Sequence, residues 1–98
     1  MNDRELLELA AKAAGIIWPP KWPYPSEGDP NWNPLTDDGD ALRLFVSLYS
    51  KGAALDAGSG GVSAQFGREF ADEWCPLEGP YDPYAATRRA IVRAAAEI

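Results

Sequence analysis

The sequence of 98 residues contains no histidine and only one cysteine, Cys75. Without histidine the chain lacks the commonest general base and metal ligand of enzymes, and Cys75 has no imidazole that could activate it as a nucleophile. A single cysteine also excludes an intramolecular disulfide, which fits a reducing compartment. We therefore expect no catalytic centre, no metal site and no cofactor, and we classify the chain as a non-enzyme.

Long apolar runs and positive charge are also scarce. No run is long enough to span a bilayer, and the acidic start MNDRELLELA predicts a helix rather than a signal peptide. Nine basic residues stand against 15 acidic ones, giving a net charge of −6 that disfavours direct binding to nucleic acid. The sequence thus predicts one domain over residues 1–98, in the cytoplasm, with neither nucleic acid nor membrane as a partner.

Both ends of the chain predict helices with clear boundaries. Asn2 and Glu5 form a capping pair and Gly15 fits a left-handed cap, so a helix is expected between them. Asp82 followed by Pro83 begins another helix, which runs to the end of the chain. Helical spacing predicts that these two helices bury Leu6, Leu7, Leu9, Ala10, Ala13 and Ala14, and Ala85, Ile91, Val92, Ala95 and Ile98.

A third helix is expected in the middle of the chain. Pro34 favours extended backbone before it, the capping types Thr36, Asp37 and Asp38 follow, and Asp40 falls in the first turn, where its charge meets the positive helix end. Gly52 is expected to close this helix. Its three carboxylates could also bind a divalent cation, but they do not follow the EF-hand pattern, so no metal site is predicted. The predicted apolar face consists of Ala41, Leu42, Phe45, Val46 and Tyr49.

Alternating apolar residues predict a small antiparallel sheet after Gly52. We expect strands at 53–56, 62–66 and 69–74, with a glycine-rich turn at 57–61 that lacks the lysine of a phosphate-binding loop. A further short strand is expected at 16–18. The predicted fold class is α+β, with an antiparallel sheet of two to four strands packed with three helices, and an open sheet edge that could pair with a second copy as a homodimer. The apolar sets of the last two strands are Val62, Ala64 and Phe66, and Phe70 with Trp74.

Residues 18–34 combine six prolines with three tryptophans and a tyrosine. Proline at this density excludes a helix or a central strand and favours extended backbone. The tryptophans either cover the core, which we favour, or form a surface that docks a partner or stacks on a planar ligand. Together with the acidic helix start and the basic last helix, this segment supplies the candidate binding residues Trp18, Trp22, Tyr24, Trp32, Asp37, Asp38, Arg88 and Arg89.

The stretches MNDRELLELAAKAAGI, WNPLTDDGDALRL and YDPYAATRRAIVRAAAEI resemble short accessory proteins encoded by tailed bacteriophages and prophages. More distantly, the layout is similar to the phage alpha-beta-alpha sandwich domain family. The resemblance covers about half of the chain and brings no catalytic residues with it. It implies a sandwich-like fold and a setting in which small phage proteins bind and inhibit host factors, including defence systems.

Three classes of function follow from these observations. The favoured class is a protein that binds and inhibits a host protein, because an acidic surface, aromatic side chains and stiff loops suit docking. The alternative is a binder of a small anionic ligand such as a nucleotide signal, with a tryptophan stacked on the base and Arg88 or Arg89 on the phosphate. The third class is a structural or morphogenetic role in the phage particle.

Overall fold

The computed structural model describes residues 2–16, 18, 32–58, 61–74 and 82–98. This part of the chain has the α+β class expected from the sequence, with three helices packed on a three-stranded antiparallel sheet in a sandwich-like arrangement. None of the described helices is both long and apolar enough to cross a membrane. The elements are α1 (Asp3–Ala14), α2 (Asp38–Ser47), the short 3-10 helix η1 (Tyr49–Lys51), β1 (Ala53–Gly58), β2 (Gly61–Phe66), β3 (Glu69–Trp74) and α3 (Pro83–Ala96).

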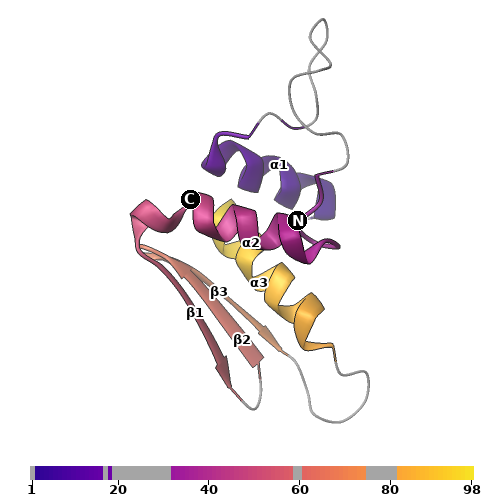
Figure 1. The fold of residues 1–98 in the computed structure, drawn as a ribbon, viewed down its shortest axis with the longest axis vertical. Helices are drawn as coiled ribbons and strands as arrows, with labels where there is room; N and C mark the ends of the chain where they lie inside the picture. The colour runs from indigo at the N-terminus through magenta and orange to yellow at the C-terminus, as the bar shows by residue number, and fades with distance from the viewer. Residues whose placement is uncertain (1, 17, 19–31, 59–60, 75–81) are drawn as a thin grey trace, which may run out of the picture.

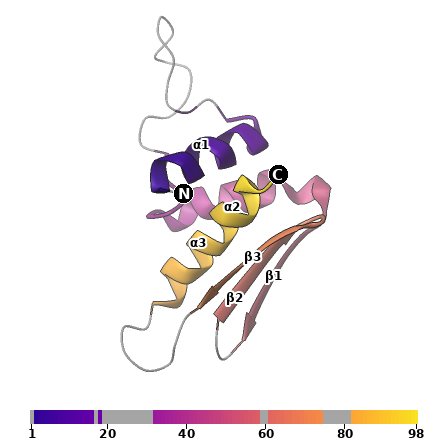
Figure 2. The same ribbon diagram turned by 180° about the vertical axis from the view of Figure 1, so that it is seen from behind.

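The three helices lie on the same side of the sheet (Figures 1 and 2). The last helix, α3, packs directly on β2 and β3, and α2 lies beside α3. The first helix, α1, packs on α3 at the side away from the sheet. In this layered arrangement α3 is the central element, because it contacts both other helices and two of the three strands.

Each of the three α-helices begins at a side-chain cap that the sequence predicts. The Asn2 Oδ1 atom accepts a hydrogen bond from the backbone N–H of Glu5 at 2.8 Å, and Asp37 Oδ2 accepts one from Asp40 N at 2.8 Å. Asp82 caps α3 in the same way. Because these oxygen atoms satisfy N–H groups that a helix leaves unpaired, the local sequence is enough to place the helix starts.

The residues after α1 do not form the short strand expected at 16–18. Neither Ile16 nor Trp18 belongs to a strand. The N–H of Ile16 donates to Ala11 O at 2.8 Å, which closes the helix together with the left-handed backbone of Gly15 at φ 71°. The backbone N–H of Ile16, which a strand would need for pairing, is therefore used by the helix cap.

The sheet has the strand order β1-β2-β3, and the central strand buries Val62, Ala64 and Phe66 as expected. Phe70, predicted for the apolar set of β3, instead lies on the opposite face of the sheet and is 61% exposed, whereas the side chain of Trp74, the other member of that set, is not among those that the structure describes. The register instead pairs buried Ala71 with Ala64, so the small side chain of β3 faces α3. Alanine at this position lets the alanine-rich α3 approach the sheet closely.

The predicted apolar face of α2 was also partly wrong. Leu42 and Val46 are each 59% exposed, and Tyr49, which lies in η1, is exposed as well. The buried face consists instead of Asp40, Ala41 and Leu44, followed by Leu48 at the end of the helix. Asp40 fixes this rotation because its Oδ2 atom accepts a hydrogen bond from the N–H of Asn33 at 3.0 Å.

The two terminal helices bury most of the predicted apolar residues. Ile91, Val92 and Ala95 of α3 are buried, whereas Ile98 lies beyond the end of the helix and is exposed. In α1 the buried residues are Leu6, Leu7, Ala10 and Ala11, whereas Leu9 is at the exposed margin of the predicted stripe.

Candidate functional site

Of the predicted binding tryptophans, Trp32 belongs to the core and Trp18 is partly buried against it. Trp32 is only 6% exposed, and its ring packs against that of Trp18 with the centroids 5.9 Å apart. The guanidinium of Arg4 lies over the Trp18 ring at 5.8 Å from its centroid. The favoured interpretation of these two rings as core cover is therefore correct. The other two predicted aromatic binding residues, Trp22 and Tyr24, lie outside the described residues.

The acidic start of α2 is tied to the last helix. Arg88 donates from Nη1 to Asp38 Oδ1 at 2.6 Å and from Nε to the backbone oxygen of Leu35 at 2.9 Å. The Arg88 side chain is only 17% exposed, whereas that of Asp38 is largely open to solvent. This arginine therefore joins α3 to the turn before α2, and Asp38 neutralises its charge.

Arg89 points toward a different part of the molecule. Its Nη1 atom lies 3.2 Å from Asp3 Oδ1 on α1, and its Nε atom lies 3.4 Å from Glu73 Oε1 on β3. Arg93 binds the same Glu73 oxygen at 2.6 Å. The basic face predicted for the last helix is thus largely paired with carboxylates of neighbouring elements.

The structure brings the predicted site residues together in separate pairs rather than in one site. Trp18 packs on Trp32, and Asp38 binds Arg88, but the surface formed by the second pair includes neither tryptophan. Among the described residues, no group of three or more histidine, cysteine, aspartate or glutamate side chains is arranged to hold a metal ion.

An apolar groove lies where α2, α3 and β1 meet, and the Asp38–Arg88 pair lies at its wall. The groove has a volume of about 380 Å³. It exists because α3 covers β2 and β3 but not β1, which leaves the helix-facing side of β1 open. The residues that line it are Asp38, Ala41 and Leu42 from α2, Leu55 from β1, and Tyr84, Thr87, Arg88 and Ile91 from α3.

Three large apolar side chains around this groove are exposed. Leu42 is 59% exposed, Leu55 is 43% exposed and Tyr84 is 68% exposed. Leu55 pairs with buried Ala64 across the sheet, so it points to the helix side, where no helix reaches it. Apolar side chains that gather in this way mark binding surfaces more often than single exposed ones do.

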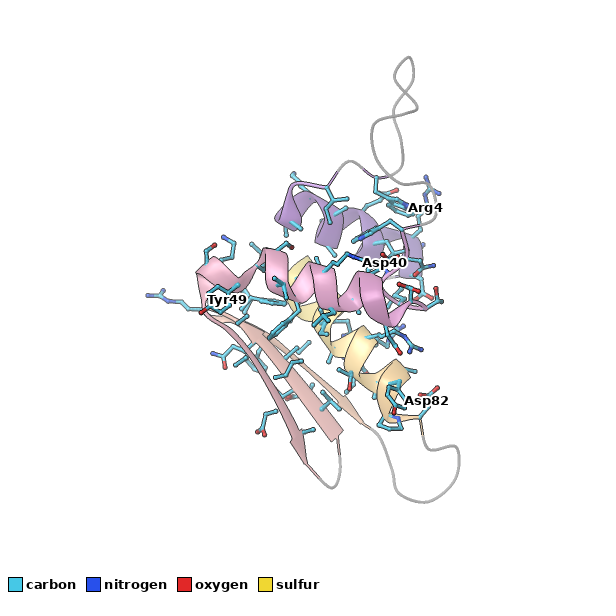
Figure 3. The ribbon with its side chains drawn as sticks, in the orientation of Figure 1. Arg4, Asp40, Tyr49 and Asp82 are labelled. Carbon is cyan, nitrogen blue, oxygen red and sulfur yellow. The ribbon has the colours of Figure 1, made fainter. Side chains whose placement is uncertain are left out.

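The apolar surface continues along α2 beyond the groove. Val46 lies one turn after Leu42 on the same helix face, and Tyr49 follows at the end of the helix. Figure 3 shows Tyr49 beside the start of β1, and Asp82 at the far end of α3, close to the lower end of the sheet. We refer to Leu42, Val46, Tyr49, Leu55 and Tyr84 as the apolar strip.

Sequence reasoning missed the apolar strip as a site, although its residues carried a signal. Leu42, Val46 and Tyr49 share helical spacing, and this stripe was assigned to the core. A second stripe through Ala41, Leu44 and Leu48 competes with it, and the structure buries that one. When a short helix has two apolar stripes, one of them is a candidate for an intermolecular contact.

Comparisons of the chain with models of known protein families, with curated proteins and with solved structures found no match.

Proposed function

We propose that this chain is a non-catalytic protein-binding module that docks a segment of a partner protein in the groove between α2, α3 and β1. The observation that carries the proposal is the gathering of exposed Leu42, Leu55 and Tyr84 around one concave surface. Burial of such side chains contributes roughly 25 cal/mol per Å² of apolar surface removed from water, and aromatic rings are common anchors of interfaces.

The charge of the chain favours a basic segment as the occupant. The net charge is −6, and the Asp38 carboxylate at the groove wall, although paired with Arg88, keeps most of its surface open to solvent. Asp37 and Asp82, both exposed, begin the two helices that flank the groove. A partner segment with one or two large apolar side chains flanked by lysine or arginine would match both features of this surface.

The arginine contacts favour a protein partner over a small anion. Arg88 and Arg89 were the candidate phosphate ligands, and both are held by carboxylates, those of Asp38, Asp3 and Glu73. A phosphate would have to compete with these ion pairs. The apolar side chains of a docked protein segment would not compete with them.

The resemblance to accessory proteins of tailed phages favours a host protein as the partner, with inhibition of that protein as the consequence of docking. A partner from the phage particle would use the same surface and would indicate a structural role. The identity of the bound protein therefore separates these two outcomes.

Selection from a random peptide library tests the proposed site. Peptides are selected on the immobilised wild-type chain and counter-selected on the Leu42→Ala/Tyr84→Ala variant, in which two exposed side chains are shortened with little expected effect on stability. We expect the selected peptides to combine large apolar residues with lysine or arginine, and to bind more weakly as salt is added.

The matched control is Phe70→Thr, which removes an equally exposed aromatic side chain from the outer face of the sheet. This variant should bind the selected peptides as the wild-type chain does. Peptides that bind the double variant as tightly as the wild type, or that lose binding with Phe70→Thr, would place the docking surface elsewhere.

A further inference from the structure

The first strand, β1, forms an open edge of the sheet. It pairs with β2 along one side over all six residues without a bulge, and β2 separates it from β3. In Figures 1 and 2 β1 lies at the outer margin of the molecule. Its sequence, AALDAG, contains no proline, lysine or arginine, which are the residues that commonly protect sheet edges.

The pairing with β2 determines which backbone groups of β1 point outward. Gly67 N donates to Gly52 O at 3.1 Å, so these two glycines form a hydrogen-bonded position next to the first strand pair, Ala53 with Phe66. Because such pairs alternate along antiparallel strands, the N–H and C=O groups of Ala53, Leu55 and Ala57 point away from β2. Within the described part of the chain, no hydrogen bond is made to these outward groups.

The opposite edge of the sheet is protected. By the same alternation, the backbone groups of Asp72 in β3 point outward, and Arg93 Nη1 donates to Asp72 O at 2.9 Å. Glu73 holds this arginine in place through a second contact at 2.6 Å. A strand that added to β3 would have to displace the Arg93 side chain, whereas β1 carries no such contact among the described residues.

The geometry points to a second copy of this chain as the occupant of the β1 edge, with the two β1 strands antiparallel about a two-fold axis. When Leu55 lies opposite Leu55 of the second copy, Ala53 lies opposite Ala57, and all three outward-pointing residues of each strand form hydrogen-bonded pairs. Six hydrogen bonds follow from this register, and the sheets join into one sheet of six strands. The two Leu55 side chains meet on the helix side.

The single charge within β1 is compatible with this register and disfavours the register shifted to centre on the next residue. Asp56 is the only charged residue of the strand, and in the Leu55-centred register it lies opposite Ala54 of the second copy. A shift that centred the pair on Asp56 would place two carboxylates directly opposite each other, which is unfavourable. Each chain carries −6 overall, so screening by salt should strengthen the dimer, whereas it should weaken a basic segment in the groove.

Sedimentation velocity of the wild-type chain over a range of concentrations tests the pairing, together with Ala57→Pro and its matched control Ala57→Val. Proline removes the outward N–H of residue 57 and leaves the bonds to β2, so an edge strand tolerates it. Valine keeps the N–H at a similar side-chain size. By symmetry the proline removes two hydrogen bonds, and we expect the dissociation constant of the dimer to rise by about thirtyfold with proline and to change little with valine.

A monomeric wild-type chain at every concentration, or Ala57→Pro that dimerises as well as Ala57→Val, would overturn the pairing. Circular dichroism of the proline variant establishes that the monomer is folded. The Leu42→Ala/Tyr84→Ala variant should dimerise like the wild type, which separates failure of this pairing from failure of the groove.

Disulfide trapping provides a second readout that does not depend on the proline variant. In a Cys75→Ser background, Leu55→Cys should form a disulfide-linked dimer on oxidation, because the two Cα atoms lie about 5.5 Å apart in the proposed register. The control is Ala54→Cys, whose two copies lie diagonally at about 7–8 Å and on the other face of the sheet. Equal trapping at both positions, or none at position 55, would contradict the register.

Discussion

Replacing Trp32 by alanine removes an indole ring that is only 6% exposed and packs on the ring of Trp18 at 5.9 Å. A tryptophan side chain buries about 200 Å², which at roughly 25 cal/mol per Å² corresponds to about 5 kcal/mol. The alanine side chain still buries a small part of this apolar area, so we expect the free energy of unfolding to fall by about 4 kcal/mol. This lies within the range of about 3–5 kcal/mol that is typical of the substitution. A domain of this size has a free energy of unfolding of about 5–15 kcal/mol, so the variant should be near the limit of stability.

Chemical denaturation and thermal melting measure this loss. Each kcal/mol lowers the melting temperature of a domain of this size by about 4–8 °C, so the expected shift is about 15–30 °C. The matched control is Phe70→Ala, whose ring is 61% exposed and whose loss should cost below about 1 kcal/mol. If Trp32→Ala were no more destabilising than Phe70→Ala, the ring would not be part of the core, and the tryptophans would return as candidate binding residues.

Two further predictions test the turn between β2 and β3 and the wall of the groove. Gly67→Ala should lower stability by about 1–2 kcal/mol, because Gly67 has φ +62° and a Cβ there would lie 3.1 Å from a backbone oxygen. The control, Gly58→Ala, should leave stability unchanged, because no atom lies within 4 Å of the position that its Cβ would take. Urea denaturation of both variants makes this comparison. Arg88→Ala should lower stability by about 1–3 kcal/mol, because it removes the ion pair with Asp38 and also leaves the Leu35 carbonyl without its donor. A double-mutant cycle with Asp38→Asn should assign at most about 1 kcal/mol to the ion pair, because the Asp38 side chain is largely exposed. A larger coupling energy would show that the pair is shielded from solvent.

Much of the fold could be predicted because its boundaries depend on local chemistry. Asn2, Asp37 and Asp82 cap the helices at their predicted positions, and the alternation of Val62, Ala64 and Phe66 placed the central strand on the correct face. Such signals need only a few neighbouring residues. The fold class followed from the order of these elements.

The rotation of elements against one another could not be predicted in the same way. In α2 the stripe through Leu42 and the stripe through Leu44 are both apolar, and a contact between Asp40 and Asn33 selects the second. In β3 the larger Phe70 was expected inside, but α3 approaches closely enough to require alanine on that face. Both errors came from ranking side chains by size without their tertiary neighbours.

The candidate site was missed for the same reason. The groove requires α3 to cover β2 and β3 and leave β1 open, and no local pattern specifies this offset. The pairing of Arg88 with Asp38 spans 50 residues of sequence and could not be predicted from local sequence patterns either. Charge and aromatic content predicted an interacting protein, but only the arrangement of elements offers a candidate surface for the proposed contact.

Affinity capture from a bacterial host lysate, quantified by mass spectrometry for matched variants, tests the central claim most directly. Wild-type chain and Phe70→Thr should retain the same protein in comparable amounts, and Leu42→Ala/Tyr84→Ala should lose it although its melting temperature is close to that of the wild type. The retained protein should also dissociate as salt is raised. Retention by the groove variant at the wild-type level would contradict the claim that this surface holds the partner.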